Sequence, residues 1–281
     1  MDWSKAKTIL IISLIVVNAI LGIAIFNLNQ GVETTVNEEF VEDSVRLLNN
    51  KEITVATEIP REMPSLKGLI VEYEILKTSE LNNKFFDNNG KVSIKGEGLV
   101  EIQNEDEKLT ILNEKHIIYE SNRIDETLRI NTDDDAIDYA TDFLVDLEYD
   151  VTDMKLSYIK KSEQRYLLEF SKIYNEKYLE SAFTNIQLDN GGIRKLERSW
   201  LNVIDVGDTP IYISSAPKSI LALLSMNEVY GKTIQDISLS YYFDPAKHEY
   251  IQNPLEAKQG KAIPAWRIQF EDGYKVFIDD Y

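Results

Sequence analysis

The stretch FTNIQLDNGGIRKLERSWLNVI, residues 183–204, decides how this chain folds. Apolar and polar residues alternate on both sides of Asn190-Gly191-Gly192, and a turn of this kind between alternating runs is a strong signal for a β-hairpin. Other runs have the same character: MKLSYIKK and RYLLEFSKIY before the hairpin, and TIQDISLSYYF, AWRIQF and KVFID after it. The sequence therefore predicts antiparallel sheet over much of the chain.

The region before residue 130 combines one helix with several strands. Residues 37–48 have a stripe at helical spacing, which predicts an amphipathic helix that ends at Asn49-Asn50. This stripe consists of Phe40, Val41, Ser44, Val45, Leu47 and Leu48. Strands are predicted at 53–59 and 69–76, a turn at 87–90, and successive antiparallel strands at 91–103, 109–113 and 116–121.

A second helix is predicted to begin after Thr132. Thr132 followed by Asp135 has the spacing of a capping box, and the acids at 133–135 suit the positive end of a helix dipole. The helix should end near Tyr149. Its expected buried stripe is Ile137, Ala140, Phe143, Leu144 and Leu147.

A third helix is predicted to begin at Ser215, a suitable N-cap residue with Pro217 in the first turn. Its buried face should contain Ile220, Leu221, Leu223 and Leu224. A helix followed by a meander of strands thus occurs about three times along the chain. This pattern predicts an α+β fold in which each helix covers one face of an antiparallel sheet.

The run TILIISLIVVNAILGIAIFNL, residues 8–28, contains no charged residue. As a helix it would be about 31 Å long, which matches the hydrocarbon core of a bilayer. Lys5 and Lys7 precede it and should stay in the cytoplasm. A cleaved signal peptide is the rival interpretation, but its apolar core is usually shorter and ends in a small-residue cleavage site. The sequence therefore predicts a single-pass type II membrane protein.

The predicted organisation has four parts. Residues 1–7 form a cytoplasmic stub and 8–28 a transmembrane anchor. Residues 29–130 form an extracellular N-terminal lobe, and 131–281 form a C-terminal lobe with units at about 131–213 and 214–281.

Three residues of the anchor are predicted to contact a partner helix: Ser13, Asn18 and Gly22. Gly22 lies one turn after Asn18, and small residues allow helices to approach closely. An amide within hydrocarbon also favours a hydrogen-bonding partner. The alternative is that Asn18 bonds its own backbone.

Composition excludes several kinds of function. The chain has 281 residues, 48 acidic and 30 basic, for a net charge of -18, so it would repel the phosphate backbone of nucleic acids. It has no cysteine and two histidines, which excludes disulfides, thiolate nucleophiles and cysteine zinc sites. A calcium site at Asp133-Asp134-Asp135 lacks alternating ligands and a turn glycine, so helix capping is favoured. No catalytic, cofactor-binding or metal-binding residue is predicted.

The opening MDWSKAKT at residues 1–8 runs directly into the apolar span, and an acidic α+β region follows. Together with IPAWRI at 263–268 and the strand that stops at Glu58-Ile59-Pro60, these features resemble the YycI family. The chain departs from the family at Asp279-Asp280-Tyr281, where a longer turn rich in asparagine, threonine and glycine is expected.

The resemblance implies a non-enzymatic accessory regulator without a cofactor. YycI-like proteins act with YycH on the sensor histidine kinase WalK in the membrane, substantially through transmembrane helices, and so affect cell-wall metabolism. The expected partners are therefore WalK and a YycH-like protein in a hetero-oligomer. Two alternatives remain: an anchored extracellular enzyme, or a binding module, acting on the cell wall.

Overall fold

The computed structural model describes residues 36–247 and 253–279, and, nearer the N-terminus, residues 3, 7, 13–15, 17–18 and 21. Within these ranges no helix has both the length and the apolar character needed to cross a membrane. Most of the predicted span at 8–28 lies outside the described residues, so the anchor stays a prediction.

Few helices accompany the strands of the described region. They are α2 (Glu38–Asn49), α3 (Thr78–Phe86), α4 (Asp133–Asp146) and the short α5 (Ala216–Ser219), with 3₁₀ turns η1 (Ile220–Ser225), η2 (Asn227–Val229) and η3 (Pro245–Lys247). The strands are β1 (Thr54–Val55), β2 (Ser65–Tyr73), β3 (Lys91–Gly96), β4 (Leu99–Gln103), β5 (Glu107–Leu112), β6 (His116–Ser121), β7 (Met154–Ser162), β8 (Arg165–Tyr174), β9 (Lys177–Asp189), β10 (Gly192–Ser199), β11 (Leu201–Tyr212), β12 (Thr233–Tyr242), β13 (Gln259–Phe270) and β14 (Lys275–Ile278).

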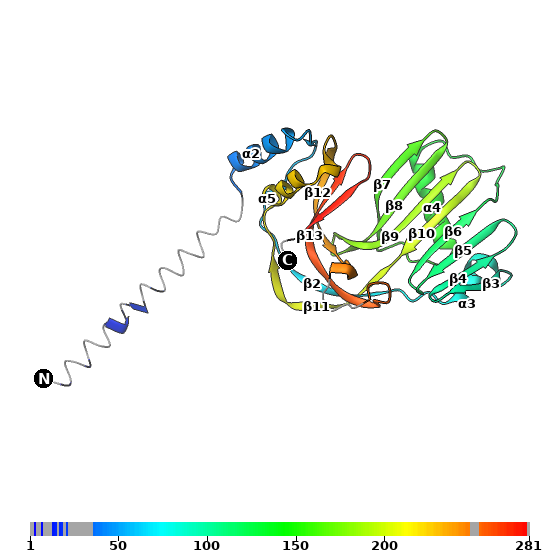
Figure 1. The fold of residues 1–281 in the computed structure, drawn as a ribbon, viewed down its shortest axis with the longest axis horizontal. Coiled ribbons are helices and arrows are strands. Elements are labelled where there is room, and N and C mark those ends of the chain that lie inside the picture. Colours follow the sequence, from blue (N-terminus) through cyan, green and yellow to red (C-terminus); the bar gives the residue numbers. More distant parts are fainter. Residues whose placement is uncertain are drawn as a thin grey trace.

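All fourteen of these strands join one mixed sheet, which confirms the predicted α+β class. Its main path runs β11-β2-β13-β12-β9-β10-β6-β5-β4-β3, and the pairs β1–β12 and β9–β12 are parallel. Figure 1 shows two halves: β3 to β10 with α4 in one, and β2 with β11 to β13 beside α2 and α5 in the other. The predicted units therefore share one sheet. Hairpin turns determine pairing between neighbouring strands, whereas β2 pairs with the distant β11 and β13.

Helix α4 begins as the sequence predicts. The Asp135 amide donates to Thr132 Oγ1 at 3.1 Å, and the Thr132 amide donates to Asp135 Oδ2 at 3.0 Å, which completes a capping box. Ala136, Ala140 and Leu144 are buried in the core against the sheet.

Helix α2 buries a narrower face than its sequence predicts. Asn37 caps it, and Ser44 and Leu48 are buried against the segment that contains α5 and η1. Phe40 is 39% exposed and Leu47 is 43% exposed. These two residues of the predicted stripe therefore lie at its margin.

The predicted strand at 91–103 divides into β3 and β4, and two helical segments also differ from the prediction. Helix α3 was not predicted, because Lys77 gives it no side-chain cap and Asn82 and Asn83 are poor helix formers. Burial of Leu81 and Phe86 in the core overrides that weak preference. The third predicted helix is only α5 followed by the 3₁₀ turn η1, although Ile220 and Leu223 are buried as expected.

The hairpin at Asn190-Gly191 is confirmed, but the long strand predicted after it divides at Trp200. The residues before Trp200 form β10, which pairs with β9 and β6. The residues after it form β11, which pairs with β2 in the other half. Trp200 is 4% exposed at the crossing, so a buried aromatic residue anchors the change of sheet partner.

A buried guanidinium connects the two halves. Arg267 on β13 is 1% exposed, and its Nε donates to Glu180 Oε1 of β9 at 2.7 Å. Its other nitrogens donate to Asp236 Oδ2 at 2.8 Å and to the amide oxygen of Gln269. Gln269 in turn donates to the Ser157 carbonyl of β7 at 2.9 Å. One side chain and its partners thus link β7, β9, β12 and β13.

We expect Arg267→Met to lower the free energy of unfolding by about 3–5 kcal/mol, because it leaves the buried carboxylate of Glu180 without its partner. Adding Glu180→Gln should recover part of this loss. Urea unfolding followed by far-UV circular dichroism measures both changes.

The matched control is Arg61→Met, since Arg61 pairs with Glu38 on the surface. It should cost less than about 1 kcal/mol. Equal losses in the two variants would show that the Arg267 network does not stabilise the fold.

Candidate functional site

The predicted partner-contact residues lie near the N-terminus, where few residues are described. Gly22 and Lys5 lie outside the described residues, while Lys7, Ser13 and Asn18 are described as helical and exposed. Asn18 Nδ2 donates to the Leu14 carbonyl at 2.9 Å. This is the backbone bond named as the alternative for Asn18. An amide has a second N–H and a carbonyl oxygen, so the bond leaves capacity for a partner helix.

The other sequence features have structural partners. His116 Nε2 lies 3.3 Å from Glu197 Oε1, and the hydrogen bond from His116 lowers the pKa of the Glu197 carboxyl. His248 lies outside the described residues. The pKa of Asp135 is lowered by hydrogen bonds from the backbone of Asn131 and Thr132, as expected for a capping acid. Among the described residues no group of three or more His, Asp or Glu could hold a metal ion.

A second buried arginine, Arg198 on β10, was not predicted as part of any site. Its guanidinium lies between the rings of Tyr149 and Trp200, 4.3 Å and 4.2 Å from their centroids. It donates to Thr184 Oγ1 at 2.7 Å and to Glu74 Oε2 at 3.3 Å. Burial lowers its pKa. Leu196, Arg198 and Trp200 alternate along the chain, so an inward position for Arg198 was visible in the sequence.

A polar pocket lies at the turn end of β8, β9 and β10, and we call it the arginine pocket. Its volume is about 840 Å³, and its charged lining consists of Asp125, Glu126, Arg129, Lys160, Glu163, Arg165, Asp189 and Arg194. Four basic and four acidic side chains therefore meet in a chain whose net charge is -18. An anion is repelled less strongly here than over the rest of the surface.

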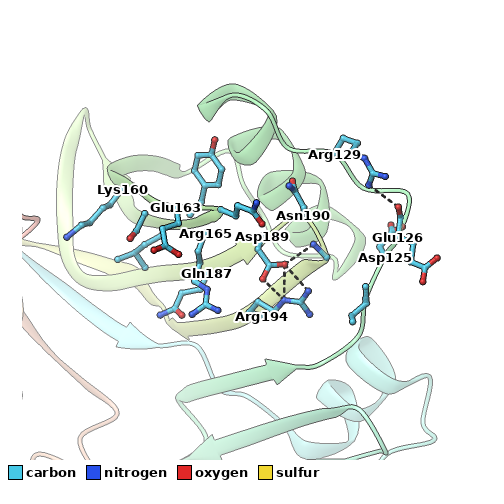
Figure 2. A pocket seen from close by; sticks show the side chains of 16 residues that line it. Asp125, Glu126, Arg129, Lys160, Glu163, Arg165, Gln187, Asp189, Asn190 and Arg194 are labelled. Atoms are coloured by element: carbon cyan, nitrogen blue, oxygen red, sulfur yellow. Dashed lines mark hydrogen bonds and ion pairs between the residues drawn. The ribbon is translucent and has the colours of Figure 1, made fainter.

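Two chain segments build this pocket around a fixed centre. Figure 2 shows the pair Asp189–Arg194 between the β7–β8 side, with Lys160 and Arg165, and the segment that carries Asp125 and Arg129. Arg194 donates from Nε to both carboxylate oxygens of Asp189 at 2.9 Å, and from Nη2 to Oδ1 at 2.8 Å. It also donates to the Arg123 carbonyl, which attaches the second segment. The β9–β10 hairpin thus positions the whole pocket.

The remaining side chains determine what the pocket can bind. Arg129 donates to the carbonyls of Glu126 and Leu128 at 2.9 and 2.6 Å, so its guanidinium is held in place. Lys160 and Arg165 are exposed and lie on β7 and β8 at the pocket wall. Guanidinium groups suit carboxylate and phosphate oxygens. The lining contains no histidine. The mixed charges of the pocket therefore suit a small zwitterionic ligand.

Sequence reasoning missed this pocket because its residues come from three separate segments. The feature of the sequence that could have indicated the pocket is the clustering of its few arginines. Three of the eight arginines in the chain line the pocket, and Arg123 adjoins it through its carbonyl.

No family model matches the chain, and no curated protein matches it by sequence. Solved structures do match its fold. An uncharacterized protein from Eubacterium rectale is 11% identical, with a TM-score of 0.54, over 88% of this chain and 95% of that chain. YycH from Bacillus subtilis is 15% identical, with a TM-score of 0.52, over 80% of this chain and 56% of that chain. These likenesses establish a YycH-like fold.

The Asp189–Arg194 pair predicts acid sensitivity. The hydrogen bond from Arg194 lowers the pKa of Asp189, so the stabilisation is present above the ordinary value near 3.9 and is lost as pH falls through the lower native-state pKa. Asp189→Asn should cost about 1–2 kcal/mol at pH 7. The gap should begin to shrink below about pH 4, because the unfolded wild-type chain then takes up a proton at Asp189 while the folded chain still holds it ionised.

Urea unfolding of both chains at pH 7 and pH 3 tests this expectation. Asp208→Asn, at an exposed position of β11, is the matched control and should change little at either pH. A gap between wild type and Asp189→Asn that is independent of pH would contradict the assignment.

Proposed function

We propose that this chain is a non-enzymatic, membrane-anchored regulator of the sensor histidine kinase WalK that acts together with a YycH-like protein. The observation that carries the proposal is the fold shared with YycH over 80% of this chain. The resemblance of residues 1–8 to the YycI family supports the same assignment. The consequence for the cell would be a change in cell-wall metabolism.

The proposed topology follows from the N-terminal sequence. Residues 8–28 cross the membrane, Lys5 and Lys7 hold the short N-terminus in the cytoplasm, and the sheet lies outside the cell. In this topology, regulation would pass through the helix in the membrane or through the outer region.

The anchor would act as a thermodynamic ligand of the kinase. A bound helix shifts the kinase only if it binds one kinase state more tightly than the other. Couplings of this kind typically amount to about 1–3 kcal/mol. An interhelical hydrogen bond of about 0.6 kcal/mol from Asn18 could supply part of that difference.

A wall-binding module is the second candidate, and the arginine pocket is the observation that favours it. Its paired charges suit a small polar ligand of mixed charge. The two functions differ in which part of the chain is necessary. A fragment of residues 1–34 that still modulates WalK favours the regulator, whereas a full-length chain that leaves WalK activity unchanged favours the binding module.

We expect Asn18→Leu to weaken association with WalK about 3-fold, which corresponds to the loss of one interhelical hydrogen bond of about 0.6 kcal/mol. Energy transfer between labelled full-length proteins in liposomes measures the association. Autophosphorylation of WalK in the same liposomes measures the regulatory effect.

Asn27→Leu is the matched control. On an ideal helix of about 100° per residue, position 27 lies on the side opposite position 18, so this change should leave association intact. If Asn18→Leu and Asn27→Leu both bind WalK like the wild type, Asn18 does not form the contact.

A further inference from the structure

A second cavity, which we call the glutamate cleft, lies where β3 to β5 meet the segment 253–258. Its volume is about 510 Å³, and its large aliphatic side chains are Ile75, Ile94, Val100 and Ile111. The turns β3–β4 and β5–β6 form one wall, and Glu256 to Lys258 form another. The arginine pocket shares none of these residues.

The floor of the glutamate cleft is an uncovered part of the core face of the sheet. Ile94, Val100 and Ile111 are cross-strand neighbours, and the row continues into Ile117. Ile117 is 0% exposed, whereas Ile94 is 79% exposed and the adjacent Ile75 is 60% exposed. The same face of the sheet is therefore buried in the core at Ile117 but exposed to solvent at Ile94. Contiguous exposed apolar surface of this kind marks interaction sites.

The rim of the cleft carries negative charge. Glu97 and Glu114 stand exposed on the two turns, and neither carries an ion pair among the described residues. Two further carboxylates, Glu74 and Glu256, complete the rim. Glu74 pairs with Arg198, and Glu256 accepts a hydrogen bond from Asn253.

The cations of the cleft do not neutralise this rim. Lys115 donates to the carbonyls of Pro254 and Ala257 at 3.3 and 3.0 Å, and its ammonium lies 4.6 Å from the centroid of the Tyr73 ring. It therefore holds the 253–258 segment in place. Lys258 is the other cation among the lining residues, and it is exposed.

Close backbone contacts preform the wall of the cleft. The Asn113 amide donates to the Gly98 carbonyl at 2.7 Å, and the Leu76 amide donates to the Glu114 carbonyl at 2.7 Å. Gly98 has a φ of +68°, and a Cβ there would lie 2.1 Å from Asn113 Oδ1. Glycine suits this position because its φ is positive and because a larger residue would have to displace the Asn113 side chain. A preformed cleft lowers the ordering cost of binding.

The edge of the sheet beside the cleft is guarded against strand addition. Strand β3 ends the main path of the sheet, carries Lys91 and Lys95, and has an irregular register between Ile94 and Gly96. Lysines and bulges are features that protect edge strands from pairing with other chains. An occupant should therefore enter with side chains over the face of β3 and β4.

We infer that the glutamate cleft docks a segment of a partner protein that presents a large aliphatic side chain flanked by lysine or arginine. The aliphatic group covers Ile75, Ile94 and Val100, and the flanking cations face Glu97 and Glu114. An anionic lipid or fatty acid would meet the unpaired carboxylates and be repelled. The assignment rests on the described sheet and does not require that the chain regulate a kinase.

Three short fluorescent peptides test the docking chemistry on the full chain in nanodiscs of zwitterionic lipid. One alternates lysine with isoleucine, one glutamate with isoleucine, and one lysine with serine; nanodiscs without protein give the background. By fluorescence anisotropy the lysine–isoleucine peptide should bind at least 10-fold more tightly than either of the others. If the lysine–isoleucine peptide binds no more tightly than either of the other two, the site is a general apolar or acidic surface and the proposal is overturned.

Variants locate the binding on the chain. Ile94→Ser and the double variant Glu97→Lys/Glu114→Lys should each weaken binding of the lysine–isoleucine peptide at least 5-fold, and all of these positions are exposed. Ile204→Ser, the same substitution at a 48% exposed position of β11, is the control. If Ile94→Ser binds the lysine–isoleucine peptide as tightly as the wild type, the proposal is overturned. It is also overturned if the chain forms dimers in the absence of peptide and Ile94→Ser abolishes them, because the cleft would then bind a second copy of the chain.

Discussion

The ion pair between Arg267 and Glu180 lies where strand β9 changes partners. Residues 183–189 of β9 pair with β10, whereas residues 178–180 pair with β12. On its other edge, β9 has residues without a partner in β8 between Leu179 and Phe183, and Ser181 there has a φ of +78°. Such a bulge bends a strand and redirects a side chain. It turns Glu180 inward to Arg267, so the geometry of the bend and the buried charge pair depend on each other.

Local signals in the sequence predicted the local structure. The capping box of α4, the Asn190-Gly191 turn and the alternation of β7 and β8 each involve residues close in the chain, and each is confirmed. The pairing of strands distant in the chain could not be predicted, because β2 could pair with any strand in which apolar and polar residues alternate in a similar way. Trp200 illustrates the limit: alternation continues through it, while the backbone changes partner.

The interior polar groups and the two cavities were harder to predict than the strands. Arg267 stands between Trp266 and Ile268, and Arg198 lies two residues from Leu196 and from Trp200. An isolated sequence does not reveal which carboxylate each arginine meets. Arg198 meets Glu74 and Arg267 meets Glu180, and in each case the carboxylate comes from a distant part of the chain. Both cavities likewise collect residues from separate segments. Composition alone described the acidic surface but not the concentration of arginine at one end of it.

The distant pairing of β2 has a consequence for synthesis of the protein. Tyr73 pairs with Leu201, and Glu72 pairs with Gln259 as well as Asn202. Until those strands leave the ribosome, β2 has no neighbour, and contacts between distant residues form slowly. The half of the sheet that contains β2 therefore stays incomplete until β11 and β13 have been synthesised, so the late strands of the chain determine when that half can close.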